Sequence, residues 1–125
     1  MTSRAYRMTD FSTVYGWAKS HGWAVFEEDV LPTDGIIIPG VCCAWVYLCS
    51  NGPFSRLAWP VSNPQASIRE VYKGLTQVIL ELHALSKERG CPLMEAAFDS
   101  TGLGRVALNA GFQTGDISLT SYYKV

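Results

Sequence analysis

Residues 64–90 read PQASIREVYKGLTQVILELHALSKERG, and this stretch decides the fold. Its apolar residues recur at spacings of three and four, the period of one buried helical face; they are Leu75, Val78, Ile79, Leu82 and Leu85. Ser67 followed by Glu70 predicts a capping box at the start of the helix. Gly90 and then Pro92 mark its end. The pattern therefore predicts a helix of about 20 residues.

The segments on either side of this helix read as strands. Residues 55–62 (SRLAWPVS) lead into it, and residues 92–98 (PLMEAAF) follow it. A strand, a tight turn and a long helix make half of a βαβ unit, and the start of such a helix can hold a phosphate on its free N–H groups. Further along, residues 102–109 predict a second helix, and residues 112–116 and 118–123 read as extended segments.

The first half of the chain predicts one helix and a meander of strands. Thr9 and Asp10 can cap a helix that runs to about Ser20. Residues 23–26 read as a short strand or an extended lead-in, and residues 27–34 as an acidic loop. The strands that follow are residues 35–39 (GIIIP) and 41–49 (VCCAWVYLC), and a hairpin with Asn-Gly leads on to the strand at 55–62. This order predicts an α+β fold, a mixed sheet covered by helices, in a single domain spanning residues 1–125.

The composition argues against several classes of function. The 125 residues carry a formal net charge of −1, which provides no electrostatic footprint for nucleic acid. No apolar run approaches the ~18 residues of a membrane span, and residues 1–10 lack the apolar core of a signal peptide. We therefore expect a cytoplasmic protein with no nucleic acid or membrane partner. Four Trp and only 17% charged residues favour a self-association surface, and hence a homo-oligomer.

The cysteines and histidines do not predict a metal site. No Cys-x-x-Cys pair occurs among the four cysteines, and the adjacent Cys42 and Cys43 would point to opposite faces of a strand. We interpret the cysteines as free thiols in a reducing compartment. We interpret His21 as a helix-end residue and His83 as a core-edge residue rather than as ligands.

The order of these elements resembles that of the GNAT family, the acetyl-CoA-dependent N-acetyltransferases. Residues 35–49 resemble the second and third strands of the family, and residues 56–90 its strand, turn and long helix. Residues 100–112 (STGLGRVALNAGF) resemble its closing helix, with the Gly-Phe pair at Gly111 and Phe112. The sequence resembles in particular the short GNAT-like proteins of tailed phages. This resemblance implies that the protein is located in the cytoplasm of the phage's host. The resemblance implies acetyl-CoA as cofactor and, as partner, an amine on a small molecule or protein.

The coenzyme loop is where the sequence departs from the family. The family pattern (Arg/Gln)-x-x-Gly-x-(Gly/Ala) aligns with QASIRE, in which Gln65 fits the first position. Ile68 and Glu70 replace the two small residues, so the loop is degenerate: one side chain crowds the backbone, and the other places negative charge where phosphate should bind. The resemblance implies that the coenzyme contacts are Val61, Ser62, Asn63, Gln65, Ala66, Ser67, Ile68 and Arg69.

The usual acid and base of the family are also missing. The family's acid is often a Tyr four residues before the Gly-Phe glycine, and that position is Ala107. The strand at 56–62 carries no carboxylate to act as a base. Asp99 could orient a substrate, act as a base or cap the closing helix. The other candidates for catalysis are phenols on the last strand, Tyr122 and Tyr123.

Two functions follow from these residues. The first is an N-acetyltransferase. Its amine acceptor would bind beside an acidic loop that contains Glu27, Glu28, Asp29 and Asp34. The alternative interpretation of this loop is a solvent-exposed acidic segment without a ligand. The second is a binding or assembly module without catalysis, such as a phage accessory or virion-associated protein. A V opening between residues 59–61 and 95–98, with the amides of residues 66–68 pointing into it, would favour the enzyme. A closed cleft beside Ser62 would favour the module.

Overall fold

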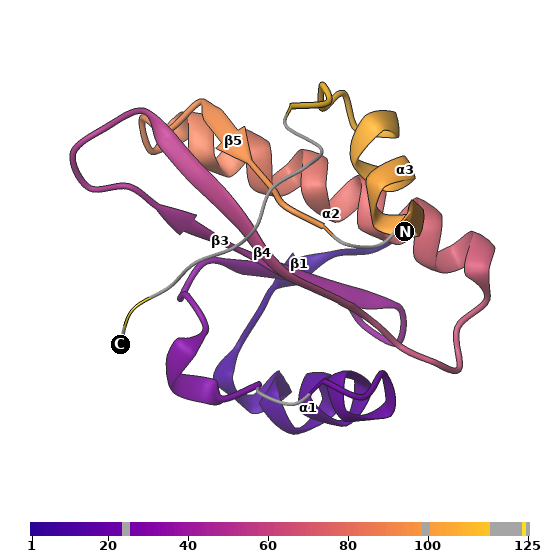
Figure 1. Cartoon of the computed structure of the whole chain (residues 1–125). Helices are drawn as coiled ribbons and strands as arrows, with labels where there is room; N and C mark the ends of the chain where they lie inside the picture. The colour runs from indigo at the N-terminus through magenta and orange to yellow at the C-terminus, as the bar shows by residue number, and fades with distance from the viewer. Residues whose placement is uncertain (24–25, 99–100, 116–123, 125) are drawn as a thin grey trace.

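The architecture is a sheet with helices on both faces (Figure 1). The computed structural model describes residues 1–23, 26–98, 101–115 and 124. In this part of the chain the strands are β1 (Arg4–Ala5), β2 (Gly35–Ile38), β3 (Cys42–Leu48), β4 (Phe54–Ser62) and β5 (Leu93–Glu95). The helices are α1 (Phe11–Ser20), α2 (Ile68–Glu88) and α3 (Thr101–Asn109), with short 3-10 turns η1 (Met8–Asp10) and η2 (Glu28–Val30).

The strands lie in the order β1-β2-β3-β4-β5. Neighbours run antiparallel except β4 and β5, which are parallel because the crossover helix α2 connects them. Figure 1 shows α1 on one face of the sheet and α2 with α3 on the other. The predicted α+β fold with a mixed, mostly antiparallel sheet is therefore confirmed. No helix in the described ranges is long and apolar enough to cross a membrane.

Helix α2 forms as its sequence pattern predicts. Ser67 Oγ accepts a hydrogen bond from Glu70 N at 3.1 Å, and Glu70 Oε1 accepts one from Ser67 N at 3.2 Å, so the capping box is present. The predicted apolar stripe packs on the sheet in a core with Cys42, Ala44 and Val46 of β3. Burial of this stripe, rather than helix propensity alone, holds the helix in place.

The opposite face of the sheet carries a second, aromatic core under α1. Trp45 is 0% exposed and packs with Trp17, Phe26 and Val61. Cys43 belongs to this core, whereas Cys42 belongs to the α2 side, as the alternation of a strand predicts. Burial raises the pKa of the Cys42 thiol to about 12, so it stays protonated at neutral pH.

Some predicted boundaries are wrong. β1 is absent from the prediction because a two-residue strand has no periodicity to detect. β5 covers only Leu93–Glu95, not residues 92–98, because it is paired with β4 only as far as Arg56. Residues 112–115 form no strand, and the predicted strand at 118–123 lies outside the described residues.

Asp10 has a different role from the predicted cap of α1. It makes no side-chain cap to α1, and its carboxylate instead accepts two hydrogen bonds from Arg4, at 2.8 Å and 2.7 Å. It also accepts the Arg7 backbone N–H at 2.9 Å. The hydrogen bond from Arg4 is the main cause of a lowered pKa of Asp10. This fork ties β1 to the start of α1.

We expect Asp10 to make the fold sensitive to acid. Because its folded pKa is lowered, its contribution is complete above the unfolded pKa of about 3.9 and disappears as the pH falls through the folded pKa. Asp10→Asn should cost about 1–2 kcal/mol of unfolding free energy at neutral pH, and much less in strong acid. Urea unfolding at both pH values tests this. Asp29→Asn, at an exposed carboxylate, is the control, and an equal Asp10→Asn loss at both pH values would contradict the account.

Candidate functional site

The candidate site lies where the pairing of β4 with β5 ends. The two strands pair only at Phe54↔Leu93, Ser55↔Met94 and Arg56↔Glu95. β4 continues to Ser62, so beyond Arg56 no described strand lies along its outer edge. The backbone N–H and C=O groups on such an edge can pair with another extended chain. The two strands are thus not paired at residues 59–61, where an opening between them would favour the enzyme.

A β-bulge in β4 coincides with this free edge. Cys43 pairs with Val61 and Trp45 with Ala58, so β4 carries one extra residue there. Trp59 in this bulge has a φ of 57°, a left-handed conformation that costs about 1–3 kcal/mol for a residue other than glycine. Sequence reasoning missed the bulge, although a proline inside a strand, at position 60, is a signal for one.

Aromatic contacts hold the bulged residue in place. The Trp59 ring lies against Trp23 and Phe26, with centroid separations of 6.0 Å and 5.9 Å. Its Nε1–H donates to Tyr47 Oη at 3.2 Å. Since bulges of this kind re-aim side chains and end strand pairing, the bulge and its aromatic support fix the shape of the β4 edge.

Asn63 fixes the loop between β4 and α2. Its Nδ2 donates to Gly40 O at 2.8 Å, and its backbone N–H donates to Val41 O at 2.8 Å. Its Oδ1 accepts the Gln65 N–H at 2.9 Å, and its C=O accepts the Ala66 N–H at 3.0 Å. The loop is therefore anchored to the turn between β2 and β3 before the helix begins.

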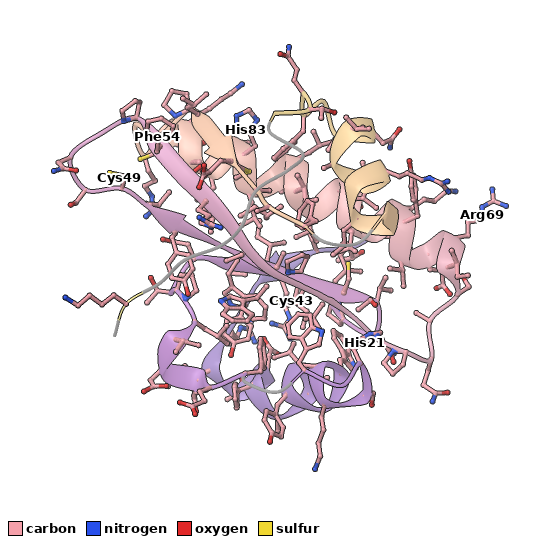
Figure 2. All side chains as sticks on the ribbon, viewed as in Figure 1. His21, Cys43, Cys49, Phe54, Arg69 and His83 are labelled. Atoms are coloured by element: carbon pink, nitrogen blue, oxygen red, sulfur yellow. The ribbon has the colours of Figure 1, made fainter. Side chains whose placement is uncertain are left out.

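The amides at the start of α2 divide into two groups. Those of Ala66 and Ser67 are occupied by Asn63 and Glu70. Those of Ile68 and Arg69 have no acceptor in the described part of the chain, as expected for the first turn of a helix. Figure 2 shows the Arg69 side chain extending outward from this end of α2. Two amides, the positive end of the helix dipole and one guanidinium are thus available to an anion.

His21 lies at the same end of β4. It is the C-cap residue of α1, as predicted, and its Nε2 lies 2.9 Å from Ser62 O and 3.3 Å from Ser62 Oγ. Figure 2 shows His21 beside the chain that leads from β4 into the loop. When Nε2–H donates to the carbonyl, Nδ1 keeps a lone pair and can accept a proton. Sequence reasoning missed this contact because no local pattern links residues so far apart.

The acidic loop separates into two parts. Residues 27–29 are exposed, and the Tyr47 hydroxyl donates to Val30 O just after them. Asp34 instead forms an ion pair with Arg89 at 3.5 Å, beyond the C-terminal end of α2. Within the acidic loop, only residues 27–29 are therefore available to attract a cation from solvent.

The other predicted site residues are placed as follows. The Val61 side chain is buried in the aromatic core, so this residue can offer only its backbone to a ligand. Ala107 is buried in α3 and has no proton to donate. Three candidates lie outside the described residues, namely Asp99, Tyr122 and Tyr123.

Comparison with known proteins finds likeness in fold. No protein-family profile and no curated protein matches the sequence. The structure of AAC(6')-Iy in complex with the bisubstrate analog CoA-S-monomethyl-acetylneamine is similar, with a TM-score of 0.70, 16% identity and coverage of 99% of this chain and 98% of that chain. Aminoglycoside N-acetyltransferase AAC(6')-Iy in complex with CoA has a TM-score of 0.67, 18% identity and coverage of 99% and 100%.

An acetyltransferase of Trypanosoma brucei is similar as well, with a TM-score of 0.67, 14% identity and coverage of 98% of this chain and 99% of that chain. Identities this low establish the fold alone. The chain thus has the acyl-CoA N-acyltransferase (GNAT) fold, as predicted from its sequence.

Proposed function

We propose that this chain is an acetyl-CoA-dependent N-acetyltransferase, with its coenzyme site on the free edge of β4 and the first turn of α2. The observation that supports this most strongly is the bulge at Trp59, on the part of β4 that continues beyond the last residue paired with β5, Arg56. A free strand edge can pair with the amide-bearing pantetheine arm of the coenzyme. AAC(6')-Iy, which has the same fold, is described in complex with CoA.

The residues at the start of α2 suit a pyrophosphate. The amides of Ile68 and Arg69 and the Arg69 guanidinium would bind its negative charge. The loop before the helix is shaped by Gln65, Ala66 and Ser67 and is anchored by Asn63. At the end of β4, Val61 and Ser62 would offer their backbone groups to the coenzyme. When bound, acetyl-CoA would supply an activated acetyl group, and this chain would hold it and orient it toward an amine.

Glu70 should weaken coenzyme binding, because its negative charge lies near the site of the phosphates. Glu70→Gln removes the charge and keeps an oxygen that can accept the Ser67 N–H, so we expect about fivefold tighter binding of acetyl-CoA, since one helix-terminus charge is worth up to about 1 kcal/mol. Calorimetric titration measures this difference. Glu88→Gln, the same change at the other end of α2, should leave the affinity unaltered. Unchanged or weaker binding by Glu70→Gln would contradict the proposed position of the phosphates.

The acceptor in this proposal is a positively charged amine on a small molecule or protein. Residues 27–29 present negative charge on the α1 face, which would attract such a cation. His21 Nδ1 would accept the proton that the amine must lose. The alternative groups for this proton transfer are Asp99, Tyr122 and Tyr123.

An activity assay tests the proposal. The purified chain is incubated with acetyl-CoA and a panel of amines (an aminoglycoside, a polyamine and a lysine peptide), and the free thiol of released CoA is measured. We expect thiol release that requires both the protein and an amine. Release no faster than without protein, under conditions in which acetyl-CoA binds, would contradict catalysis on these acceptors.

A second function is favoured by other features of the same site. The amides of Ala66 and Ser67 are already satisfied within the loop, and the buried Ala107 offers no acid. If acetyl-CoA does not bind, the chain would act as a GNAT-fold binding or assembly module, such as a phage accessory or virion-associated protein. The calorimetric titration separates the two functions.

A further inference from the structure

The outer face of α2 carries an open groove on the side away from the sheet. Its volume is about 650 Å³, and Asn109 of α3 also lines it. Two apolar side chains on this face are partly exposed, Tyr72 at 37% and Leu80 at 49%. The residues of α2 that line the groove include Tyr72, Lys73, Gln77, Leu80, Glu81 and Ala84, which we call the α2 outer face.

The charges on the α2 outer face complement those on the same face of a second copy. Lys73 lies four residues before Gln77, and Glu81 lies four residues after it. If two α2 helices pack antiparallel about a two-fold axis at Gln77, each Lys73 faces the Glu81 of the other copy. Such an isologous arrangement makes the Lys73–Glu81 contact twice, which is the usual geometry of a homodimer. We propose that the α2 outer face binds a second copy of this chain.

The polar groups of this face are already ordered by the N-terminal residues. Gln77 Nε2 donates to Met1 O at 2.8 Å and to Glu81 Oε2 at 3.1 Å. Ser3 Oγ donates to Glu81 Oε1 at 2.6 Å. Because Gln77 and Glu81 are held in place before association, less conformational entropy is lost when a second copy binds.

The expected dimer is weak and independent of the coenzyme site. α2 has 21 residues and so is about 31 Å long. A helix pair of that length buries less than the ~1,600 Å² of a standard interface, so we expect a dissociation constant in the micromolar range. The α2 outer face points away from the sheet, so pairing through this face does not involve the edge of β4. The inference does not depend on the proposed function.

Sedimentation velocity over roughly a hundredfold range of protein concentration tests the dimer. We expect the wild-type chain to shift from monomer to dimer. Lys73→Glu places like charges opposite each other and should weaken the dimer at least about tenfold. The double variant with Lys73→Glu and Glu81→Lys restores opposite charges and should recover dimerisation. Leu80→Glu should also give a monomer.

Lys19→Glu on α1 is the matched control, because it makes the same charge change away from the groove and should dimerise like the wild type. Thermal melting of each variant checks that the fold is intact. A wild-type chain that is monomeric at every concentration would overturn the proposal. A dimer that Lys73→Glu and Leu80→Glu leave unchanged would overturn the assignment to this face, as would a folded double variant that does not re-associate.

Discussion

Replacing Trp45 with alanine is expected to lower the free energy of unfolding by about 4 kcal/mol. The side chain is fully buried in the central strand β3, and its ring contacts Tyr6 and Phe26 at centroid separations of 5.0 Å and 5.8 Å. Truncation removes the transfer energy of the indole and leaves a cavity between the sheet and α1. Urea unfolding followed by circular dichroism measures the change. A loss below about 1 kcal/mol would contradict the packing described for this core.

Gly35 provides a coupled test of the same contact. A Cβ at this position would lie 2.4 Å from Trp45 Cδ1, so Gly35→Ala should cost about 2 kcal/mol in the wild type. In the Trp45→Ala background the clash with the indole is gone and only the contact with Tyr6 Cβ at 3.0 Å remains, so the two losses should not add. Gly16→Ala is the control, because a Cβ there meets no atom within 4 Å and should be neutral or stabilising. Full additivity of Gly35→Ala and Trp45→Ala would contradict direct contact.

The second large effect is expected at His21. His21→Gln should lower kcat/KM for acetyl transfer about 100-fold, because the amide can donate to Ser62 O but cannot accept the proton as an imidazole does. The loss should lie in kcat rather than KM, with the affinity for acetyl-CoA unchanged.

His83→Gln is the matched control. The Nε2 of His83 lies 2.8 Å from Pro92 O, so both histidines contact a backbone carbonyl. His83 differs in that it lies on α2, away from the loop between β4 and α2. Its replacement should preserve both kcat and kcat/KM. Equal activity of the two variants would remove His21 from the mechanism, and the proton acceptor would then be sought at Asp99, Tyr122 or Tyr123.

Local sequence patterns predict the main elements of this fold well. The stripe on α2 and the Ser67–Glu70 cap depend on residues only a few positions apart, and both are present as expected. The opposite orientations of Cys42 and Cys43 follow from the alternation of a strand alone. Each of these features is set by periodicity and is therefore readable from sequence.

The candidate site is harder to predict because it depends on contacts between distant residues. His21 contacts Ser62, which is 41 positions away in the sequence, and no local sequence pattern predicts such a contact. The left-handed conformation of Trp59 is imposed by tertiary packing on an aromatic cluster, and only the neighbouring proline hints at it. The same holds for Asp34, whose partner Arg89 follows a helix far along the chain.

Calorimetric titration of the purified chain with acetyl-CoA tests the central claim most directly. We expect saturable binding in the micromolar range, accompanied by about 2.7 kcal/mol of stabilisation at a hundredfold excess over the dissociation constant. No heat of binding and no thermal shift at millimolar acetyl-CoA would contradict the acetyltransferase and leave the binding module as the function of this fold.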